Sequence, residues 1–219
     1  NMFNVLQHTI TGWPGGKPNT DDSHRPERAN PSKKRVILFS PHPDDDVISM
    51  GGTFSKLIKQ GHEVHVVYQT SGNIAVTDDE ALKFAEVCND FVGEDENKIN
   101  FKAVIDFLKN KGENQIDSLE VRKLKGLIRR RESYAAVRYT GLKDENAHFL
   151  DLPFYETGQV KKNPLSEIDI DIVADIIAKI KPHQVFAAGD LADPHGTHEV
   201  CLNAIFAAMK KLKSQPYMA

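Results

Sequence analysis

The stretch Arg35-Val36-Ile37-Leu38-Phe39-Ser40 runs directly into Pro41-His42-Pro43-Asp44-Asp45-Asp46, and this junction decides the fold. A continuous apolar run is typical of a strand in the middle of a parallel sheet, because both of its faces are buried. A helical pattern over residues 47–60 follows and closes at Gly61, a residue favoured just after helix ends. Residues 63–69 form a second β-rich run. Strand, helix and strand in this order predict a βαβ unit.

The rest of the chain continues this alternation of strands and helices. Thr77-Asp78-Asp79-Glu80 is a capping box that predicts a helix start, with Phe84, Val87, Cys88 and Phe91 at helical spacing behind it. Further patterns predict helices over residues 101–108, 118–140, 166–180 and 197–212, and strands over residues 148–152 and 184–188. The expected fold class is therefore α/β, a Rossmann-like three-layer sandwich with a mostly parallel central sheet.

The first residues differ in composition from the remainder. Glycine and proline clusters are typical of turns and loops, and this stretch contains Gly12-Trp13-Pro14-Gly15-Gly16-Lys17-Pro18 and further prolines after it. We expect residues 1–33 to be an extended lead-in or linker, and residues 34–219 to be one domain. Because the sequence begins with Asn before Met, we expect the domain to be cut from a longer chain.

Composition excludes several classes of protein. The 219 residues carry a net charge of −3, which predicts no general attraction to nucleic acid or to an anionic membrane. No apolar run approaches the roughly 18 residues of a membrane span. Residues 1–4 lack the basic and apolar order of a signal peptide. With only two cysteines, the chain fits a reducing cytoplasm and excludes both a disulfide scaffold and a Cys-rich zinc site.

Two predicted strand ends carry an unusual set of polar residues. One is His42-Pro43-Asp44-Asp45-Asp46, and the other is the stretch from Asp190 to His198 that includes Asp193, His195 and His198. Ligands of open α/β sheets bind outside the carboxyl ends of the strands, so a parallel sheet can bring the two segments together. Imidazole and carboxylate are ligands of catalytic zinc. Each segment alone also has an ordinary explanation, as carboxylates favouring a helix dipole or as surface histidines at a helix start.

The two segments together resemble the LmbE-like, or PIG-L, superfamily of zinc-dependent de-N-acetylases. The resemblance rests on Pro41-His42-Pro43-Asp44-Asp45 and His195-x-x-His198 and covers roughly residues 35–209. Shorter motifs extend it: Gly51-Gly52, Gly61-His62-Glu63-Val64, Thr70-Ser71-Gly72, Arg129-x-x-Glu132 and Phe149-Leu150-Asp151-Leu152-Pro153. Any one of them is weak, but the set is specific.

The resemblance narrows further to the C-terminal part of long bacterial glucosamine-6-phosphate deaminase-like proteins. It rests on Thr11-Gly12-Trp13, on the stretch from Tyr68 to Val76, and on the stretch from Asp190 to His198. This resemblance implies a deaminase-like domain fused on the N-terminal side in the full protein. It leaves homo-oligomer formation open.

The family resemblance implies a hydrolase that removes the N-acetyl group from an N-acetylglucosamine-type sugar or sugar phosphate. It assigns His42, Asp45 and His198 as ligands of Zn²⁺ or another divalent ion. Asp44 would be the general base, and His195 would stabilise the oxyanion. Arg129, Gly51 and Asp46 would contact substrate, although Arg129 equally suits an ion pair with Glu132 on one helix face.

The chain departs from the family at two positions, one of which is Asp46, where relatives often have glutamate. At the other, Thr197 stands where relatives often have an aspartate that orients the first histidine, and Asp193 is the nearest replacement. We therefore expect Asp193 to hydrogen-bond His195 or one of the ligand histidines and so to orient its ring. The departure at Thr197 also favours an alternative, in which the domain has a deaminase-linked or regulatory role and binds a sugar phosphate without hydrolysing it.

Overall fold

The computed structural model describes residues 33–92, 101–188, 195–213 and 217–218. Within these ranges the chain forms a five-stranded sheet of order β3-β2-β1-β4-β5, in which every neighbouring pair is parallel. The strands are β1 (Arg35–Ser40), β2 (Glu63–Tyr68), β3 (Ala147–Phe149), β4 (Gln184–Ala187) and β5 (Tyr217–Met218). The predicted central parallel strand is confirmed, because β1 is paired on both sides.

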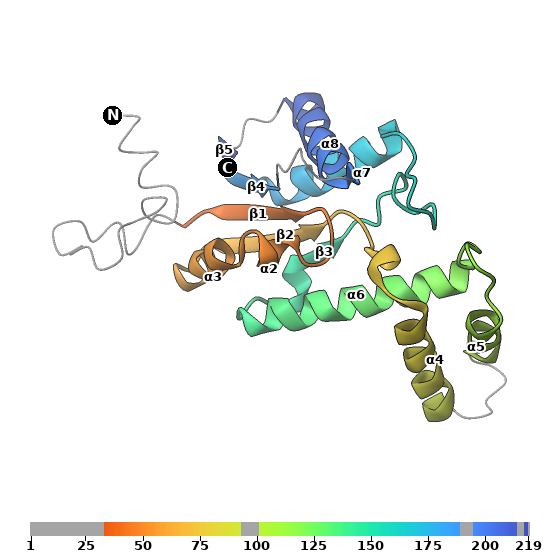
Figure 1. Ribbon diagram of the computed structural model, residues 1–219. Helices are drawn as coiled ribbons and strands as arrows, with labels where there is room; N and C mark the ends of the chain where they lie inside the picture. Colours follow the sequence, from red (N-terminus) through yellow and green to blue (C-terminus); the bar gives the residue numbers. More distant parts are fainter. Residues whose placement is uncertain (1–32, 93–100, 189–194, 214–216, 219) are drawn as a thin grey trace, which may run out of the picture.

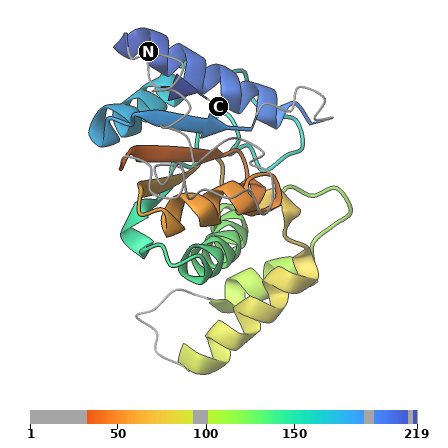
Figure 2. The same cartoon turned by 90° about the vertical axis from the view of Figure 1, so that its left-hand side faces the viewer.

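Helices cover both faces of this sheet (Figure 1). They are α2 (Asp45–Ile48), α3 (Gly51–Lys59), α4 (Asp78–Val92), α5 (Phe101–Lys109), α6 (Leu119–Tyr139), α7 (Glu167–Ile180) and α8 (Thr197–Leu212). Both views show α7 and α8 on one face and α3 and α6 on the other, with α4 and α5 beyond α6 (Figure 2). The α/β fold with helices flanking a parallel sheet is therefore confirmed. Among the described residues, no helix combines the length and the apolar character of a membrane span.

The alternation of side chains along β1 explains why the whole strand is apolar. Val36 and Leu38 point into one core with Phe54 of α3. Ile37 and Phe39 point into the opposite core, formed with α7 and α8. All four β1 side chains are fully buried, so a polar residue at any of them would lose its hydration.

The predicted helix starts are set by side-chain caps. Ser118 Oγ accepts the Val121 N–H at the start of α6. Ser166 and Asp169 form a reciprocal capping box at the start of α7. Thr77 Oγ1 accepts the Glu80 N–H before α4, as its sequence pattern predicts.

Three details differ from the sequence predictions. The helix expected over residues 47–60 is two helices, α2 and α3, interrupted ahead of the weak helix formers Gly51-Gly52. The strand expected over residues 148–152 is shorter, because Asp151 has a left-handed φ of 46° that ends the regular pleat. The apolar row of α4 faces outward: Phe84, Val87 and Phe91 are 46%, 65% and 92% exposed.

The strand order creates one crevice that is suited to a ligand. From β1 the sheet grows in one direction to β2 and β3, and in the other to β4 and β5. The carboxyl ends of β1 and β4 are therefore neighbours at the point where the strand order reverses. The predicted lead-in, residues 1–33, lies outside the described residues apart from Lys33.

Candidate metal centre

A cavity of about 510 Å³ lies at the carboxyl ends of the strands. Its walls come from the segments that follow β1, β2 and β3, from α6 and from the start of α8. The lining residues are His42, Asp44, Asp45, Ile48, Gly72, Ile74, Ala75, Arg129, Tyr155, Val160, Lys162, His195, Thr197 and His198. The two segments singled out in the sequence thus meet in one cavity, although His42 and His198 are 156 residues apart.

The loop after β1 is held in a fixed shape. Thr70 Oγ1 donates to the carbonyl of Pro41 at 2.7 Å, which ties the loop to the end of β2. Gly72 packs on this loop with φ of 64°, and a Cβ there would lie 2.7 Å from Cδ of Pro43. Glycine is therefore required at this close approach. Inside the loop, the backbone N–H of His42 donates to Asp45 Oδ2 at 2.8 Å and fixes that carboxylate.

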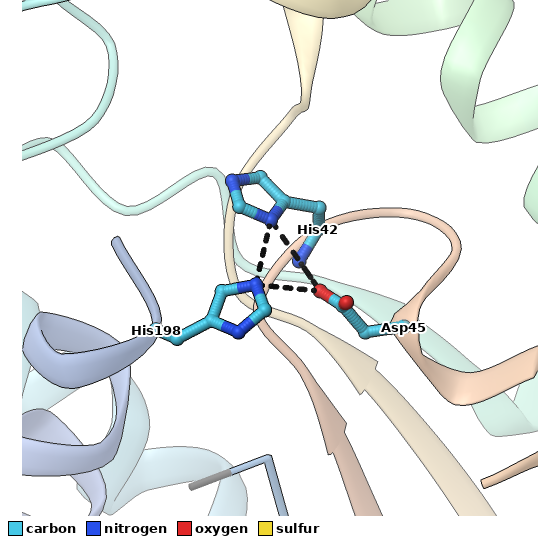
Figure 3. A group of neighbouring side chains, drawn as sticks. All are labelled: His42, Asp45 and His198. Atoms are coloured by element: carbon cyan, nitrogen blue, oxygen red, sulfur yellow. Dashed lines mark hydrogen bonds and ion pairs between the residues drawn. The ribbon is translucent and has the colours of Figure 1, made fainter. Parts of the chain in front are cut away.

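Three side chains direct their donor atoms at one point (Figure 3). His42 Nδ1 and His198 Nε2 are 3.2 Å apart. Asp45 Oδ2 lies 3.4 Å from each of these two nitrogens. Within the described part of the chain, His42, Asp45 and His198 have their ligand atoms close enough together to hold one metal ion.

The spacing of these donors fits a tetrahedral ion. Zinc bonds of about 2.0–2.2 Å in tetrahedral geometry place neighbouring nitrogen and oxygen donors roughly 3.3–3.5 Å apart. The two separations of 3.4 Å fall in that range, and the third, 3.2 Å, lies just below it. Two imidazoles and one carboxylate also form a donor set of catalytic type, in which three protein ligands leave one position open.

The charge of Asp45 is stabilised despite its burial. Burial alone would raise its pKa, but hydrogen bonds from the side chain and backbone of His42 outweigh burial, and the charges of His198 and His42 add to them. The pKa of Asp45 therefore lies below its ordinary value, and the carboxylate stays ionised. An ionised ligand is what a divalent cation requires.

Asp44 lies in the same cavity and is held from α6. Arg129 Nη2 donates to Asp44 Oδ2 at 2.8 Å and to the carbonyl of Pro43 at 3.3 Å. Arg129 Nη1 bonds Glu132 at 2.5 Å. The ion pair between Arg129 and Glu132 on one face of α6 is thus present. The same guanidinium also reaches Asp44 in the cavity. It fixes the carboxylate predicted to be the base.

Asp46 and Gly51, both expected to contact substrate, lie elsewhere. Asp46 is 1% exposed and accepts a hydrogen bond of 2.9 Å from the Tyr68 hydroxyl. Burial, opposed by that bond, raises the pKa of Asp46. Asp46 thus supports the loop from behind. Gly51 lines a separate depression between α3 and α6, near Ala135 and Ala136, so it is also reassigned.

The segment at the start of α8 supplies a further part of the cavity wall. His195 is exposed and lines the cavity, and Gly196 begins α8 with a left-handed φ of 67°. Thr197, one of the two departures from the family, is buried at 2% and also lines the wall. Asp193, expected to support a histidine, lies outside the described residues.

Two further residues line the cavity. Tyr155 is buried, and its ring meets the ring of His42 edge-on at 5.8 Å. Lys162 was not singled out at all, although it lines the cavity. A signal existed in its position, since a lysine soon after a predicted strand end and Pro153 lies in the region where α/β folds place their sites.

Comparison with known proteins identifies relatives for most of the chain. The family described as PIG-L, GlcNAc-PI de-N-acetylase, matches residues 37–209. A glucosamine-6-phosphate deaminase-like protein of Bacteroides thetaiotaomicron is 55% identical over 98% of this chain, and the match covers 33% of that protein. Diacetylchitobiose deacetylase of Thermococcus kodakarensis is 43% identical over 47 residues, which are 22% of this chain and 18% of the relative. The chain thus spans a third or less of these two relatives.

Solved structures share the fold. N,N′-diacetylchitobiose deacetylase of Pyrococcus horikoshii has a TM-score of 0.51 and 22% identity, over 97% of this chain and 57% of that one. The 4-carboxy-2-hydroxymuconate hydratase of Pseudomonas putida has a TM-score of 0.50 and 22% identity, over 81% of this chain and 56% of that one. A deacetylase and a hydratase therefore share this architecture, so the fold alone does not decide the chemistry.

Proposed function

The chain belongs to the PIG-L family of GlcNAc-PI de-N-acetylases, and from that premise we propose that it is a metal-dependent hydrolase acting on an N-acetylglucosamine-type sugar or sugar phosphate. The bond that it cleaves is the amide of the N-acetyl group. The products are acetate and a free amine. Zinc is the ion that the donor set suits best, and other divalent ions with similar ligand preferences are alternatives.

One observation carries this proposal. His42, Asp45 and His198 converge from two strand ends onto one point, and that point borders a cavity that also contains an acid–base candidate and a further histidine. Three side chains on a divalent ion leave a coordination position open for a reactant. A site that merely stabilises the fold has its ligands closed off, whereas this one opens into about 510 Å³.

The protein residues divide the chemistry among them. An ion held by His42, Asp45 and His198 would supply a water of lowered pKa and a Lewis acid for the amide carbonyl. Asp44 accepts the proton of the attacking water, and the same carboxyl then delivers it to the leaving nitrogen. A carbon–oxygen bond forms, the carbon–nitrogen bond breaks, and the proton moves from water to the amine. His195 lines the cavity where it can donate to the oxygen that becomes negative.

Arg129 keeps Asp44 in the geometry that these transfers need. Its guanidinium bonds the Asp44 carboxylate at 2.8 Å and the loop carbonyl of Pro43 at 3.3 Å. With its own side chain only 17% exposed, Arg129 is itself held by its surroundings. A base fixed in this way loses little entropy when the substrate arrives.

A metal-reconstituted assay tests the proposal. The protein is loaded with Zn²⁺ and incubated with N-acetylglucosamine, its 6-phosphate and N,N′-diacetylchitobiose, and released acetate is measured. We expect acetate from at least one of them, suppressed by a chelator and restored by added metal. Loaded protein that binds one ion per chain yet releases no acetate from any of the three contradicts a deacetylase function.

A second candidate function follows from the match to the deaminase-like protein. In it the domain binds a sugar phosphate and regulates or serves a fused deaminase-like domain without hydrolysis. The buried Thr197, where relatives often have an aspartate, favours this reading. The two functions separate in the same assay, since binding of the sugar phosphate without acetate release supports regulation.

A further inference from the structure

Lys162, on the loop that follows β3, places its ammonium group at the wall of the cavity. Its Nζ lies 3.6 Å from the centroid of the Tyr155 ring. The same Nζ donates to the carbonyl of Gln159 at 2.9 Å and to that of Tyr155 at 3.4 Å. The side chain is therefore held in place by its own loop and does not sweep through solvent.

Lys162 and Arg129 are cationic side chains of the cavity, and they differ in whether their charge is paired with a carboxylate. Arg129 is paired with Asp44 and Glu132. Lys162 forms no ion pair with any carboxylate in the described part of the chain, where it contacts two carbonyls and a ring. The charge of Glu156 influences Lys162, but the Glu156 carboxylate accepts hydrogen bonds from Ser71 N–H at 3.3 Å and from Asn73 Nδ2 at 2.9 Å.

Burial makes this cation costly in the absence of an anion. It lowers the pKa of Lys162 to about 8, although the charge of Glu156 acts in the opposite direction. Its ring and carbonyl contacts are weak compensation for lost hydration. An anion brought by a ligand would restore the favourable charge pairing.

The position of Lys162 relates it to the predicted reaction centre. Tyr155 presents one face to Lys162, and its ring meets His42 edge-on with centroids 5.8 Å apart. Lys162 and the converging donors therefore line the same cavity, and both Lys162 and His42 contact the Tyr155 ring. A sugar whose N-acetyl group lies at the donors would occupy the cavity that Lys162 lines.

We propose that Lys162 binds an anionic substituent, a phosphate or a carboxylate, on the sugar whose N-acetyl group is removed. This inference rests on the proposed function and deepens it by naming the substrate class. Lys162 is then a specificity-determining residue. Arg129 does not take this role because its charge is spent on the Asp44 and Glu132 carboxylates.

The test compares four zinc-loaded proteins: wild type, Lys162→Met, Lys162→Arg and Lys161→Met. Lys161 is the adjacent, exposed lysine of the same loop, so its variant is a matched control for net charge. The substrates are neutral N-acetylglucosamine, N-acetylglucosamine 6-phosphate and the carboxylate-bearing N-acetylmuramate. We expect Lys162→Met to lower the ratio of kcat/KM for the preferred anionic substrate to that for the neutral one by about 10- to 100-fold, the worth of one charge-assisted hydrogen bond. Lys161→Met should keep that ratio, and Lys162→Arg should recover most of it.

A binding measurement on metal-free protein keeps this inference separate from the hydrolase itself. Calorimetric titration with glucosamine 6-phosphate and with glucosamine should show tighter binding of the phosphate in wild type, and loss of that preference in Lys162→Met. The preference observed without acetate release would support the inference and overturn the hydrolase. Equal binding of the two ligands, or an equal loss for all substrates in Lys162→Met, would assign Lys162 to loop structure and overturn the inference.

Discussion

Among the described residues, two histidine pairs differ in what surrounds them: one lies at the carboxyl ends of the strands and one lies within the sheet. His42 and His198 approach to 3.2 Å at the carboxyl ends of the strands, and His65 and His148 approach to 3.0 Å between β2 and β3. Each pair has a nearby carboxylate, Asp45 in the first and Glu63 in the second. Residue types alone would make both pairs candidate metal sites.

The geometry of the carboxylate separates the two pairs. Asp45 Oδ2 lies 3.4 Å from the facing nitrogen of each partner, so all three donors share one focus. Glu63 lies 3.3 Å from His65 Nε2, the nitrogen turned away from His148. A neutral His65 that donates to Glu63 from Nε2 can accept from His148 at Nδ1, and this row of hydrogen bonds needs no ion. Convergence of donors, and not proximity of histidines, marks the candidate metal centre.

The largest expected effect separates these pairs by metal content. His198→Ala should lower zinc affinity by more than about 100-fold, which exceeds the usual cost of losing a residue that only orients a ligand, and acetate release should vanish with the metal. His148→Ala should keep one ion per chain. Elemental analysis after dialysis against limiting zinc measures both. Metal loss in His148→Ala, or metal retention in His198→Ala, would break the comparison.

The next effect distinguishes the ligand carboxylate from the base. Asp44→Asn should retain zinc and lose about 10²–10⁴-fold in kcat, the usual contribution of general acid–base catalysis. Asp45→Asn should instead weaken zinc binding. Metal content and acetate release are measured on the same preparations. Should Asp44→Asn lose its metal and Asp45→Asn keep it, the two roles are exchanged.

A smaller effect tests the third carboxylate of this run as a structural group. Tyr68→Phe removes the hydroxyl that donates to the buried Asp46, and an unsatisfied buried acceptor costs roughly 1–3 kcal/mol. Urea unfolding should show that loss, while zinc content is unchanged. Tyr139→Phe is the control, because Tyr139 is 93% exposed. Unchanged stability with lost activity in Tyr68→Phe would return Asp46 to the substrate site.

The smallest expected effect is on the pH dependence of folding stability, through His148 of the second histidine pair. Burial, together with the charges of His65 and Lys179, lowers the pKa of His148 to about 4 from 6.5. Between those two values the unfolded chain binds a proton that the folded protein does not, so His148 makes stability fall as pH drops through this window. His148→Gln should therefore lose less stability than wild type between about pH 7 and about pH 5. Identical losses in urea unfolding at the two pH values would refute the assignment.

The fold and the convergence of His42 and His198 could be predicted from the sequence for a physical reason. The apolar run at Val36–Phe39 and the caps at Ser118 and Ser166 are local signals. Parallel strands then bring their carboxyl ends together, so His42 and His198 follow from topology. The family resemblance supplied the roles of the individual residues.

The part of the cavity wall formed by the loop after β3 could not be predicted from local sequence signals. Tyr155 and Lys162 belong to an irregular loop whose path depends on contacts such as Lys162 with the Gln159 carbonyl. Asp46 and Gly51 lie outside the cavity lining for a similar reason, because a small step along a tight loop or helix moves a residue away from the cavity. Which of three adjacent aspartates faces inward is set by the packing of Tyr68 and Ser40, not by local sequence.

The most direct test of the central claim is anomalous X-ray diffraction at the zinc edge from crystals of zinc-loaded protein. The account predicts one strong peak per chain, within about 2.0–2.2 Å of His42 Nδ1, His198 Nε2 and an Asp45 oxygen. No peak at the His65–His148 pair is expected. A fully occupied peak at that second pair, or loaded crystals with no peak between His42, Asp45 and His198, would contradict the claim that convergent donors at the strand ends form the metal centre.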